Sequence, residues 1–104
     1  MSSEWYWAIG LFEGEGCIYI RKDKPQAHLF VRMTDLDVLQ RLHKLWGGSI
    51  KKQTAPKNPL WKQAWRWNLY QKEAVSNILV AILPYLSERR ACKALDALDR
   101  IDGI

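Results

Sequence analysis

Residues 8–16 read AIGLFEGEG, a run in which small and acidic residues interrupt an apolar helix pattern. The pattern predicts a helix that extends to about Glu13 and is ended by the glycines that follow. Gly10 then lies inside the helix, at a cost of about 1 kcal/mol relative to alanine. Gly10 and Gly14 are four residues apart and share one helix face, so we predict a bare surface that another backbone can approach closely.

Two acidic residues, Glu13 and Glu15, stand at the C-terminal end of this helix, where the helix dipole disfavours negative charge. We predict that two copies of the helix pack through Gly10 and Gly14 across a twofold axis and bring two Glu15 carboxylates together. Bound Mg²⁺, a hard cation that prefers oxygen ligands, would relieve their repulsion. Divalent ions flanked by carboxylates activate water and stabilise the leaving group of a phosphodiester. The alternative interpretation is a glycine helix cap followed by two solvated acids.

The chain carries a net charge of +5, and its positive charge is concentrated in the middle of the sequence. Between Arg21 and Lys72, twelve Lys or Arg residues stand against three Asp. Such a concentration is typical of a surface that faces a nucleic acid. The alternative interpretation is a solvated basic surface with no specific partner.

The length of 104 residues predicts one domain, spanning residues 1–104. Cys17 and Cys92 are isolated and belong to no Cys/His cluster, which argues against a zinc site, and free thiols suit a reducing compartment. No signal peptide is visible, and the longest apolar stretch, residues 78–83, is too short to span a membrane. We therefore expect a protein of a prokaryotic cytoplasm or an organelle, not secreted and with no membrane partner.

The rest of the sequence predicts the elements that surround this helix. Alternating and β-branched runs predict strands over 17–21, 28–33, 49–53 and 61–69, with a turn over 23–25 and a loop over 54–59. Helical spacing predicts helices over 36–46, 74–82 and 88–101. The signals for helix ends are Ser2 or Ser3 and Ser87 as caps, Thr34 with Asp37 as a capping box, and Gly47-Gly48 and Pro84 as breaks. The order α-β-β-α-β-β-α-α implies an α+β domain with helices on one face of an antiparallel sheet and a largely basic open face.

Alternation within the strands predicts which side chains face away from the core. In the strand over 28–33, Leu29, Val31 and Met33 suit the core, so the side chains between them face outward. The same reasoning for all four strands selects basic, amide and aromatic side chains, of the kinds that bind phosphates and read base edges. The predicted DNA-facing residues of the strands are Tyr19, Arg21, His28, Arg32, Lys51, Gln53, Lys62, Arg66 and Asn68.

A second basic group, Arg89, Arg90 and Lys93, stands in the first turns of the last predicted helix. The helix dipole disfavours cations there, whereas an external phosphate would be bound both by the helix start and by the arginines. We therefore predict that this group also contacts DNA. The alternative interpretation is a helix start whose only favourable charge is Glu88.

Residues 8–16 resemble the LAGLIDADG motif of homing endonucleases, in the form small-x-Gly-Leu-aromatic-acid-Gly-acid-Gly. The similarity extends over nearly the whole chain. Residues 31–39 followed by Leu42 resemble the second strand and following helix of the family. The segments 46–50, 65–67 and 82–86, the last of them followed by the basic group, resemble later parts of the family's pattern.

The resemblance implies a single-motif, homodimeric homing endonuclease whose strands form a saddle over the DNA major groove. Glu15 falls at the position of the family's metal-binding acid, more often Asp, and the Gly14 carbonyl would be a further metal ligand. Arg89 falls where members commonly have a catalytic Lys near the scissile phosphate, and Glu13 where they have a structural acid. Ala8 would join Gly10 and Gly14 in the dimer interface.

The implied activity is a metal-dependent double-strand cut, with Mg²⁺ or another hard divalent cation, at a long, roughly palindromic target. The implied partners are double-stranded DNA and a second copy of the chain, with no small-molecule substrate. Two alternatives exist among relatives of the family. One is a DNA-binding module that has lost cleavage, and the other is an RNA-binding intron-splicing factor, or maturase.

Overall fold

The computed structural model describes residues 2–102. The elements are α1 Ser3–Glu15, β1 Gly16–Ile20, β2 Ala27–Met33, α2 Leu36–Trp46, β3 Ser49–Lys52, β4 Trp65–Leu69, α3 Lys72–Ile82, a 3₁₀ turn Leu83–Tyr85 and α4 Glu88–Ile101. Apart from that short turn, this is the predicted order of elements.

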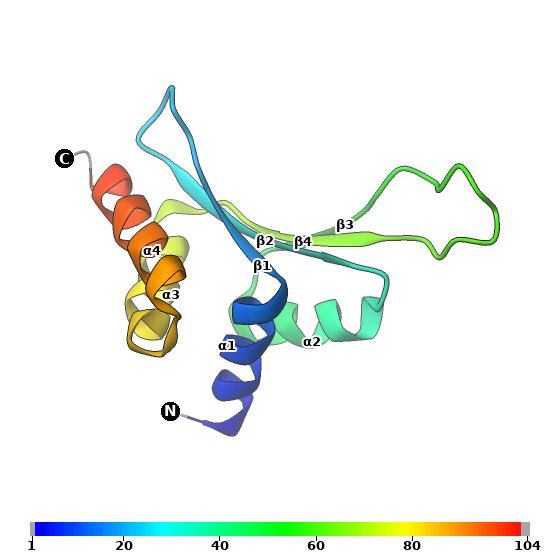
Figure 1. The fold of residues 1–104 in the computed structure, drawn as a ribbon, viewed down its shortest axis with the longest axis horizontal. Coiled ribbons are helices and arrows are strands. Elements are labelled where there is room, and N and C mark those ends of the chain that lie inside the picture. The colour runs from blue at the N-terminus through cyan, green and yellow to red at the C-terminus, as the bar shows by residue number, and fades with distance from the viewer. Residues whose placement is uncertain (1, 103–104) are drawn as a thin grey trace.

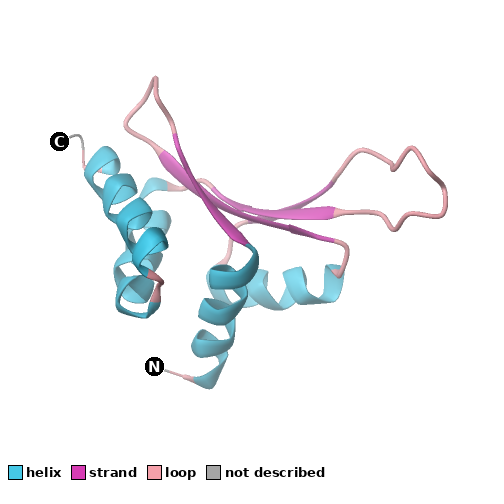
Figure 2. Cartoon of the chain, viewed as in Figure 1, coloured by secondary structure: helices cyan, strands magenta, loops and turns pink. Residues whose placement is uncertain are grey.

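The strands of residues 2–102 form one antiparallel sheet in the order β1-β2-β4-β3. The helices all lie on one side of this sheet and leave its other face open (Figure 1). Both hairpins bend toward the open side at their tips, so the open face is concave along the strands (Figure 2). The predicted α+β class, the saddle-shaped antiparallel sheet and the placing of the helices on one face are confirmed.

The core lies between the covered sheet face and the helices. Leu29 and Val31 of β2 pair across the sheet with Leu69 and Trp67 of β4, and all four side chains are buried. Burying each such side chain stabilises the fold by roughly 1.5–3 kcal/mol. The helices add the buried side chains Phe12, Leu39, Leu42, Leu79, Ile82 and Ala94.

The first helix is longer than predicted. α1 continues through Gly14 to Glu15, and Gly16 is its C-cap, with an extended backbone at φ −82°. The prediction that Gly14 ends the helix is therefore wrong. Glycine is required instead at Gly16, because a Cβ there would lie 2.3 Å from the ring of Phe12.

The predicted helix caps have mixed outcomes. The Ser2 hydroxyl accepts a hydrogen bond from the Trp5 N–H at 3.4 Å, which confirms a serine cap for α1. The capping box at Thr34 is wrong, because the N-cap of α2 is Asp35 and its side chain makes no capping bond. Ser87 is the N-cap of α4 as predicted, yet its side chain does not cap the helix. No helix within residues 2–102 has the length and apolar character needed to cross a lipid bilayer.

The predicted strands over 49–53 and 61–69 are both shorter in the structure. β3 ends at Lys52, and only Trp65–Leu69 of the later segment pairs with its neighbours. Residues 53–64 form a long loop that extends away from the body of the molecule (Figure 1). The alternation over residues 61–64 predicted a strand, but within residues 2–102 no strand lies opposite this segment to pair with it. Trp61 therefore stays 63% exposed.

The loop satisfies its backbone locally. The side-chain oxygen of Asn58 accepts the Leu60 N–H at 2.9 Å. The Gln63 amide donates to the carbonyl oxygens of Gln53 and Ala64 at 2.7 and 2.9 Å. Side chains that bond to nearby backbone groups compete with strand pairing, which explains why the sheet stops before this loop.

A candidate nucleic-acid interface and metal site

Three basic side chains lie side by side on adjacent strands of the open face. Arg32 of β2 is directly opposite Arg66 of β4, which is directly opposite Lys51 of β3. We call these residues the basic row. Like charges in directly opposite positions destabilise a sheet. The acids that form ion pairs within residues 2–102 pair with other cations, so the basic row keeps its charge and suits an anionic partner.

Arg66 is fixed on this face by two neighbours. Its guanidinium carbon lies 3.7 Å from the centre of the Phe30 ring, and its Nε donates to the Asn68 side-chain oxygen at 2.7 Å. Asn68 is only 1% exposed, and its amide also donates to the Arg66 carbonyl at 3.3 Å. The prediction that Asn68 faces DNA directly is therefore corrected: its amide is buried beneath Arg66.

Aromatic rings cover the part of the open face nearest the β1–β2 hairpin. The ring of His28 lies 4.8 Å from that of Tyr19 and 4.9 Å from that of Tyr70. Burial lowers the pKa of His28 below its ordinary value of 6.5, and the charges of Arg66 and Arg21 lower it further, which favours the neutral imidazole. Tyr70 was missed by the sequence reasoning. It stands two residues after Asn68, so the alternation that selected Asn68 also points to it.

The β1–β2 turn carries positive charge but binds part of it internally. The Arg21 guanidinium is paired with the Asp23 carboxylate through bonds of 3.1 and 2.9 Å. Arg100 of α4 donates to three carbonyl oxygens of the turn, those of Arg21, Lys22 and Lys24, at 2.6–3.1 Å. Arg21 is thus less available than predicted. Arg100, which no local pattern marks, holds the turn in place.

The remaining two predicted strand contacts lie outside the strands. Gln53 is the first residue after β3, and its backbone N–H donates to the Ala64 carbonyl at 3.1 Å. Lys62 is exposed in the loop over 53–64 rather than on β4. Their place relative to the basic row is therefore set by the loop and not by strand alternation.

The two acids at the end of α1 have different surroundings. Glu15 is exposed at the last position of the helix, immediately before β1. Glu13 turns toward α4, and its Oε1 accepts the Ser87 N–H at 3.1 Å. This geometry supports a structural role for Glu13 and leaves the Glu15 carboxylate free to bind a ligand.

Glu15 and Gly14 offer oxygen donors of the kind that Mg²⁺ prefers. The Gly14 carbonyl is one of the last four of α1, which lack a partner inside the helix. One chain does not complete a metal site from side chains alone: between residues 2 and 102, no group of three or more His, Cys, Asp or Glu is placed to hold a metal ion.

The outer face of α1 is bare, as predicted. A Cβ built at Gly10 or Gly14 would meet no heavy atom of the rest of the fold within 4 Å, and both residues are exposed. Their neighbour Tyr6 is half exposed on the same helix. Ala8 differs: it is 0% exposed in the core of its own chain. The expectation that Ala8 contributes to a dimer interface is therefore wrong, because it has no surface left to offer.

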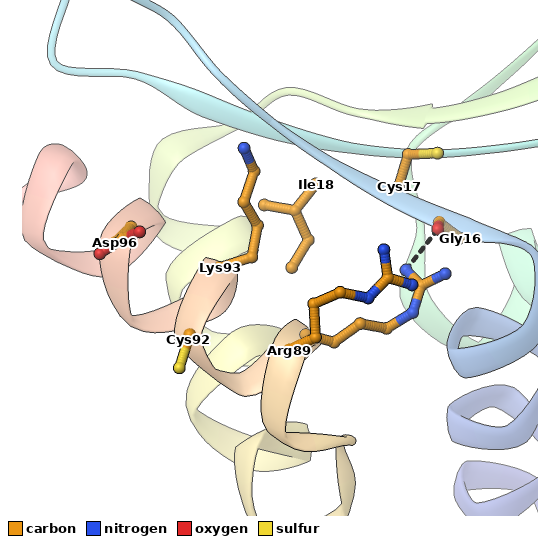
Figure 3. A pocket seen from close by; sticks show the side chains of 8 residues that line it. Gly16, Cys17, Ile18, Arg89, Cys92, Lys93 and Asp96 are labelled. Atoms are coloured by element: carbon orange, nitrogen blue, oxygen red, sulfur yellow. Dashed lines mark hydrogen bonds between the residues drawn. The ribbon is translucent and has the colours of Figure 1, made fainter.

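The start of α4 and β1 enclose a hollow that is lined by basic side chains. Arg89 and Lys93 extend from α4 toward β1, and Lys93 lies beside Ile18 (Figure 3). Arg90 also lines the hollow, but its guanidinium donates to the Gly16 carbonyl oxygen, and its Nε lies 3.7 Å from Glu13 Oε2. Arg89 and Lys93 remain available to an external phosphate, whereas these internal contacts occupy part of the Arg90 guanidinium, and its binding to DNA stays a prediction.

Comparison with solved structures shows that this fold is similar to that of the LAGLIDADG homing endonucleases. The homing endonuclease I-CvuI, in complex with its target in the presence of Ca, is similar with a TM-score of 0.74 and 20% identity. That alignment covers 95% of this chain and 66% of I-CvuI. The predicted resemblance is confirmed at the level of the fold.

Two further endonucleases share the fold. I-TnaI has a TM-score of 0.67 and 16% identity, with 93% of this chain and 70% of that one covered. The LAGLIDADG homing endonuclease I-SmaMI, bound to cleaved DNA, has a TM-score of 0.60 and 22% identity, with 84% and 31% covered. The chain thus spans about two thirds of I-CvuI and less than a third of I-SmaMI. No protein-family model and no curated protein sequence matches the chain.

Proposed function

We propose that this protein is a DNA endonuclease of the homing type, which binds a long, roughly palindromic target as a homodimer and cuts both strands with a divalent metal. The observation that carries the proposal is the position of Glu15. This exposed carboxylate stands where the bare face of α1 meets the first strand of the open, basic sheet. A second copy packed on α1 would bring two such carboxylates to the DNA-facing side of the sheet.

The glycines of α1 support the homodimer. Inside a helix, each glycine costs about 1 kcal/mol relative to alanine, and no contact within residues 2–102 requires glycine at Gly10 or Gly14. Close approach of a second backbone is a physical reason for both. Because a twofold dimer presents the same surface twice, its DNA target would be roughly palindromic.

The proposed metal site lies where the ends of the two packed α1 helices meet. The Glu15 carboxylates and Gly14 carbonyls of both copies would hold Mg²⁺ or another hard divalent cation. When bound, such a cation activates water and stabilises the leaving oxygen of a phosphodiester. The similar protein I-CvuI was crystallised with its own target in the presence of Ca, and with the I-CreI target, which was not cleaved, in the presence of Mg.

The side chains of this chain have distinct proposed roles. The basic row binds the DNA backbone and bases along the saddle. Arg89 and Lys93 bind the phosphate that is cut, and Arg89 stabilises the charge that develops on it. Glu13, through Ser87, holds the start of α4 in place beside Glu15.

The test is to select targets from a randomised duplex DNA library and then assay cleavage with Mg²⁺. Wild-type protein should bind a twofold-related site and cut it. Glu15→Gln should still bind it and should fail to cut, because the amide keeps the shape but loses the charge that holds the metal. Glu73→Gln, which changes an exposed acid at the start of α3, is the matched control and should cut like wild type.

Each other outcome has a definite meaning. A wild-type protein that binds its selected site and never cuts it is a DNA-binding module. Cleavage by Glu15→Gln at the wild-type rate would show that the Glu15 carboxylate is not required for cleavage. If no DNA is enriched, the proposed function is wrong.

A further inference from the structure

Within residues 2–102, Arg66 is the one member of the basic row whose orientation is fixed by contacts with other side chains. Its guanidinium carbon lies 3.7 Å from the centre of the Phe30 ring, so the guanidinium rests on that ring. Its Nε donates to Asn68 Oδ1 at 2.7 Å. Phe30 and Asn68 are directly opposite each other on β2 and β4, so both restraints come from one cross-strand pair.

The restraints leave a defined set of donors. A guanidinium has five N–H groups, and the one on Nε is taken by Asn68. No acceptor within residues 2–102 takes a hydrogen bond from the two terminal nitrogens of Arg66. The four N–H groups of the terminal nitrogens therefore remain, and two of them, one on each nitrogen, point in parallel from the outer edge of a fixed plane.

Both polar atoms of the Asn68 side-chain amide are bonded to Arg66. It is 1% exposed, and burying an amide is costly unless its polar atoms are bonded. Its oxygen accepts from the Arg66 side chain and its nitrogen donates to the Arg66 carbonyl, so both atoms serve Arg66. A cation that only neutralises phosphates needs no such fixing, because charge attraction has little dependence on direction.

We propose that Arg66 reads a guanine in the major groove of each half-site and that Phe30 and Asn68 are its positioning residues. The inference rests on the proposed function, in that it requires the open face to bind duplex DNA. Two parallel arginine donors match the O6 and N7 acceptors of guanine, a pattern that no other base presents in the major groove. Fixing the side chain before binding lowers the entropy lost on recognition. Arg32 and Lys51, the unrestrained members of the row, bind phosphates.

The experiment compares base preferences, not cleavage. Duplex targets are selected from a randomised library with Ca²⁺ in place of Mg²⁺, and affinity and its salt dependence are measured for wild type, Arg66→Gln and Arg32→Gln. The two variants each lose one positive charge from the same row, so each should bind more weakly at low salt. Arg66→Gln alone should lose a guanine preference of roughly 5- to 100-fold at one position in each half-site.

Two further measurements separate the positioning role and guard against misfolding. Asn68→Leu keeps the charge of Arg66 and should reduce the same guanine preference several-fold with no change in salt dependence. Replacing that guanine by 7-deazaguanine removes the N7 acceptor. It should weaken wild-type binding several-fold, and this test needs no variant to fold.

The contrary outcomes are distinct. If Arg66→Gln lowers affinity and salt dependence as Arg32→Gln does while every base preference is kept, Arg66 is a phosphate contact and the inference is wrong, although the DNA-binding function stands. The inference also fails if 7-deazaguanine is bound as tightly as guanine at every guanine of the site. If wild-type protein enriches no sequence, both the inference and the proposed function fail.

Discussion

The guanidinium of Arg90 donates a hydrogen bond to the carbonyl oxygen of Gly16, which joins the first turn of α4 to the point where α1 becomes β1. Glu13 strengthens the same junction, since its Oε1 accepts the Ser87 N–H and its Oε2 lies 3.7 Å from Arg90 Nε. The helix that carries Arg89 is thereby fixed relative to Glu15. We conclude that Arg90 organises the proposed site from within the chain.

Replacing Arg90 with Met should therefore destabilise the fold. Glu13 Oε2 is buried with no hydrogen-bond partner and relies on the Arg90 charge, so the substitution leaves it and the Gly16 carbonyl unsatisfied. We expect a loss of roughly 1–3 kcal/mol in the free energy of unfolding, measured by urea denaturation. Arg89→Met, at an exposed neighbouring position, is the control and should leave stability nearly unchanged while slowing cleavage. Equal stability of the two variants would show that the Arg90 contacts do not contribute to the free energy of unfolding.

Replacing Gly10 with Leu should separate folding from assembly. A Cβ at Gly10 meets no atom of the described part of the chain within 4 Å, and leucine favours a helix by up to about 1 kcal/mol relative to glycine, so the monomer should stay folded. The dimer should be lost, because the added side chain blocks close packing of two α1 helices. Analytical ultracentrifugation with and without DNA measures this, with Gln40→Leu on the exposed side of α2 as the control. A wild-type protein that is monomeric in both conditions would rule out the proposed dimer.

Two adjacent glycines should differ in their tolerance of alanine. Gly47 and Gly48 both have positive φ, 75° and 87°, which strains any other residue by roughly 1–3 kcal/mol. A Cβ at Gly47 meets open space, whereas one at Gly48 would lie 2.4 Å from the Asn68 carbonyl oxygen. Gly48→Ala should therefore be the more destabilising of the two in urea denaturation, because backbone must move as well. If both substitutions cost the same, the backbone around Gly48 and the Asn68 carbonyl oxygen moves apart more easily than the 2.4 Å approach indicates.

The stability of the fold should fall in mild acid through His28. Burial, followed by the charges of Arg66 and Arg21, lowers the pKa of His28 below 6.5, so the unfolded chain takes up a proton more readily than the folded one. This contribution to stability is complete above the unfolded pKa and is lost as the pH falls toward the folded pKa. Urea denaturation between about pH 7.5 and pH 5 should show a smaller loss for His28→Gln than for wild type. An unchanged pH dependence in the variant would assign the acid sensitivity to other groups.

The order of the elements could be predicted because its signals are local. Helical spacing, strand alternation and the serine cap of α1 each depend on neighbours a few residues away, and they are sufficient to indicate an α+β domain with one open sheet face. The bare face of α1 was also readable, since Gly10 and Gly14 are one helical turn apart. The basic row followed from alternation alone, once β2, β3 and β4 were identified.

The sequence by itself therefore determined the order of helices and strands, the bare helix face and the concentration of positive charge on an open sheet. Only the tertiary structure decided which of the polar side chains remain free for a partner. Asn68 and Arg90 carry the same chemistry as the residues that we propose contact DNA, yet one is buried beneath Arg66 and the other is bonded to Gly16. Such assignments depend on contacts between segments far apart in the chain, as in the pair Arg90 and Gly16, and no local pattern records where a distant carbonyl oxygen will lie.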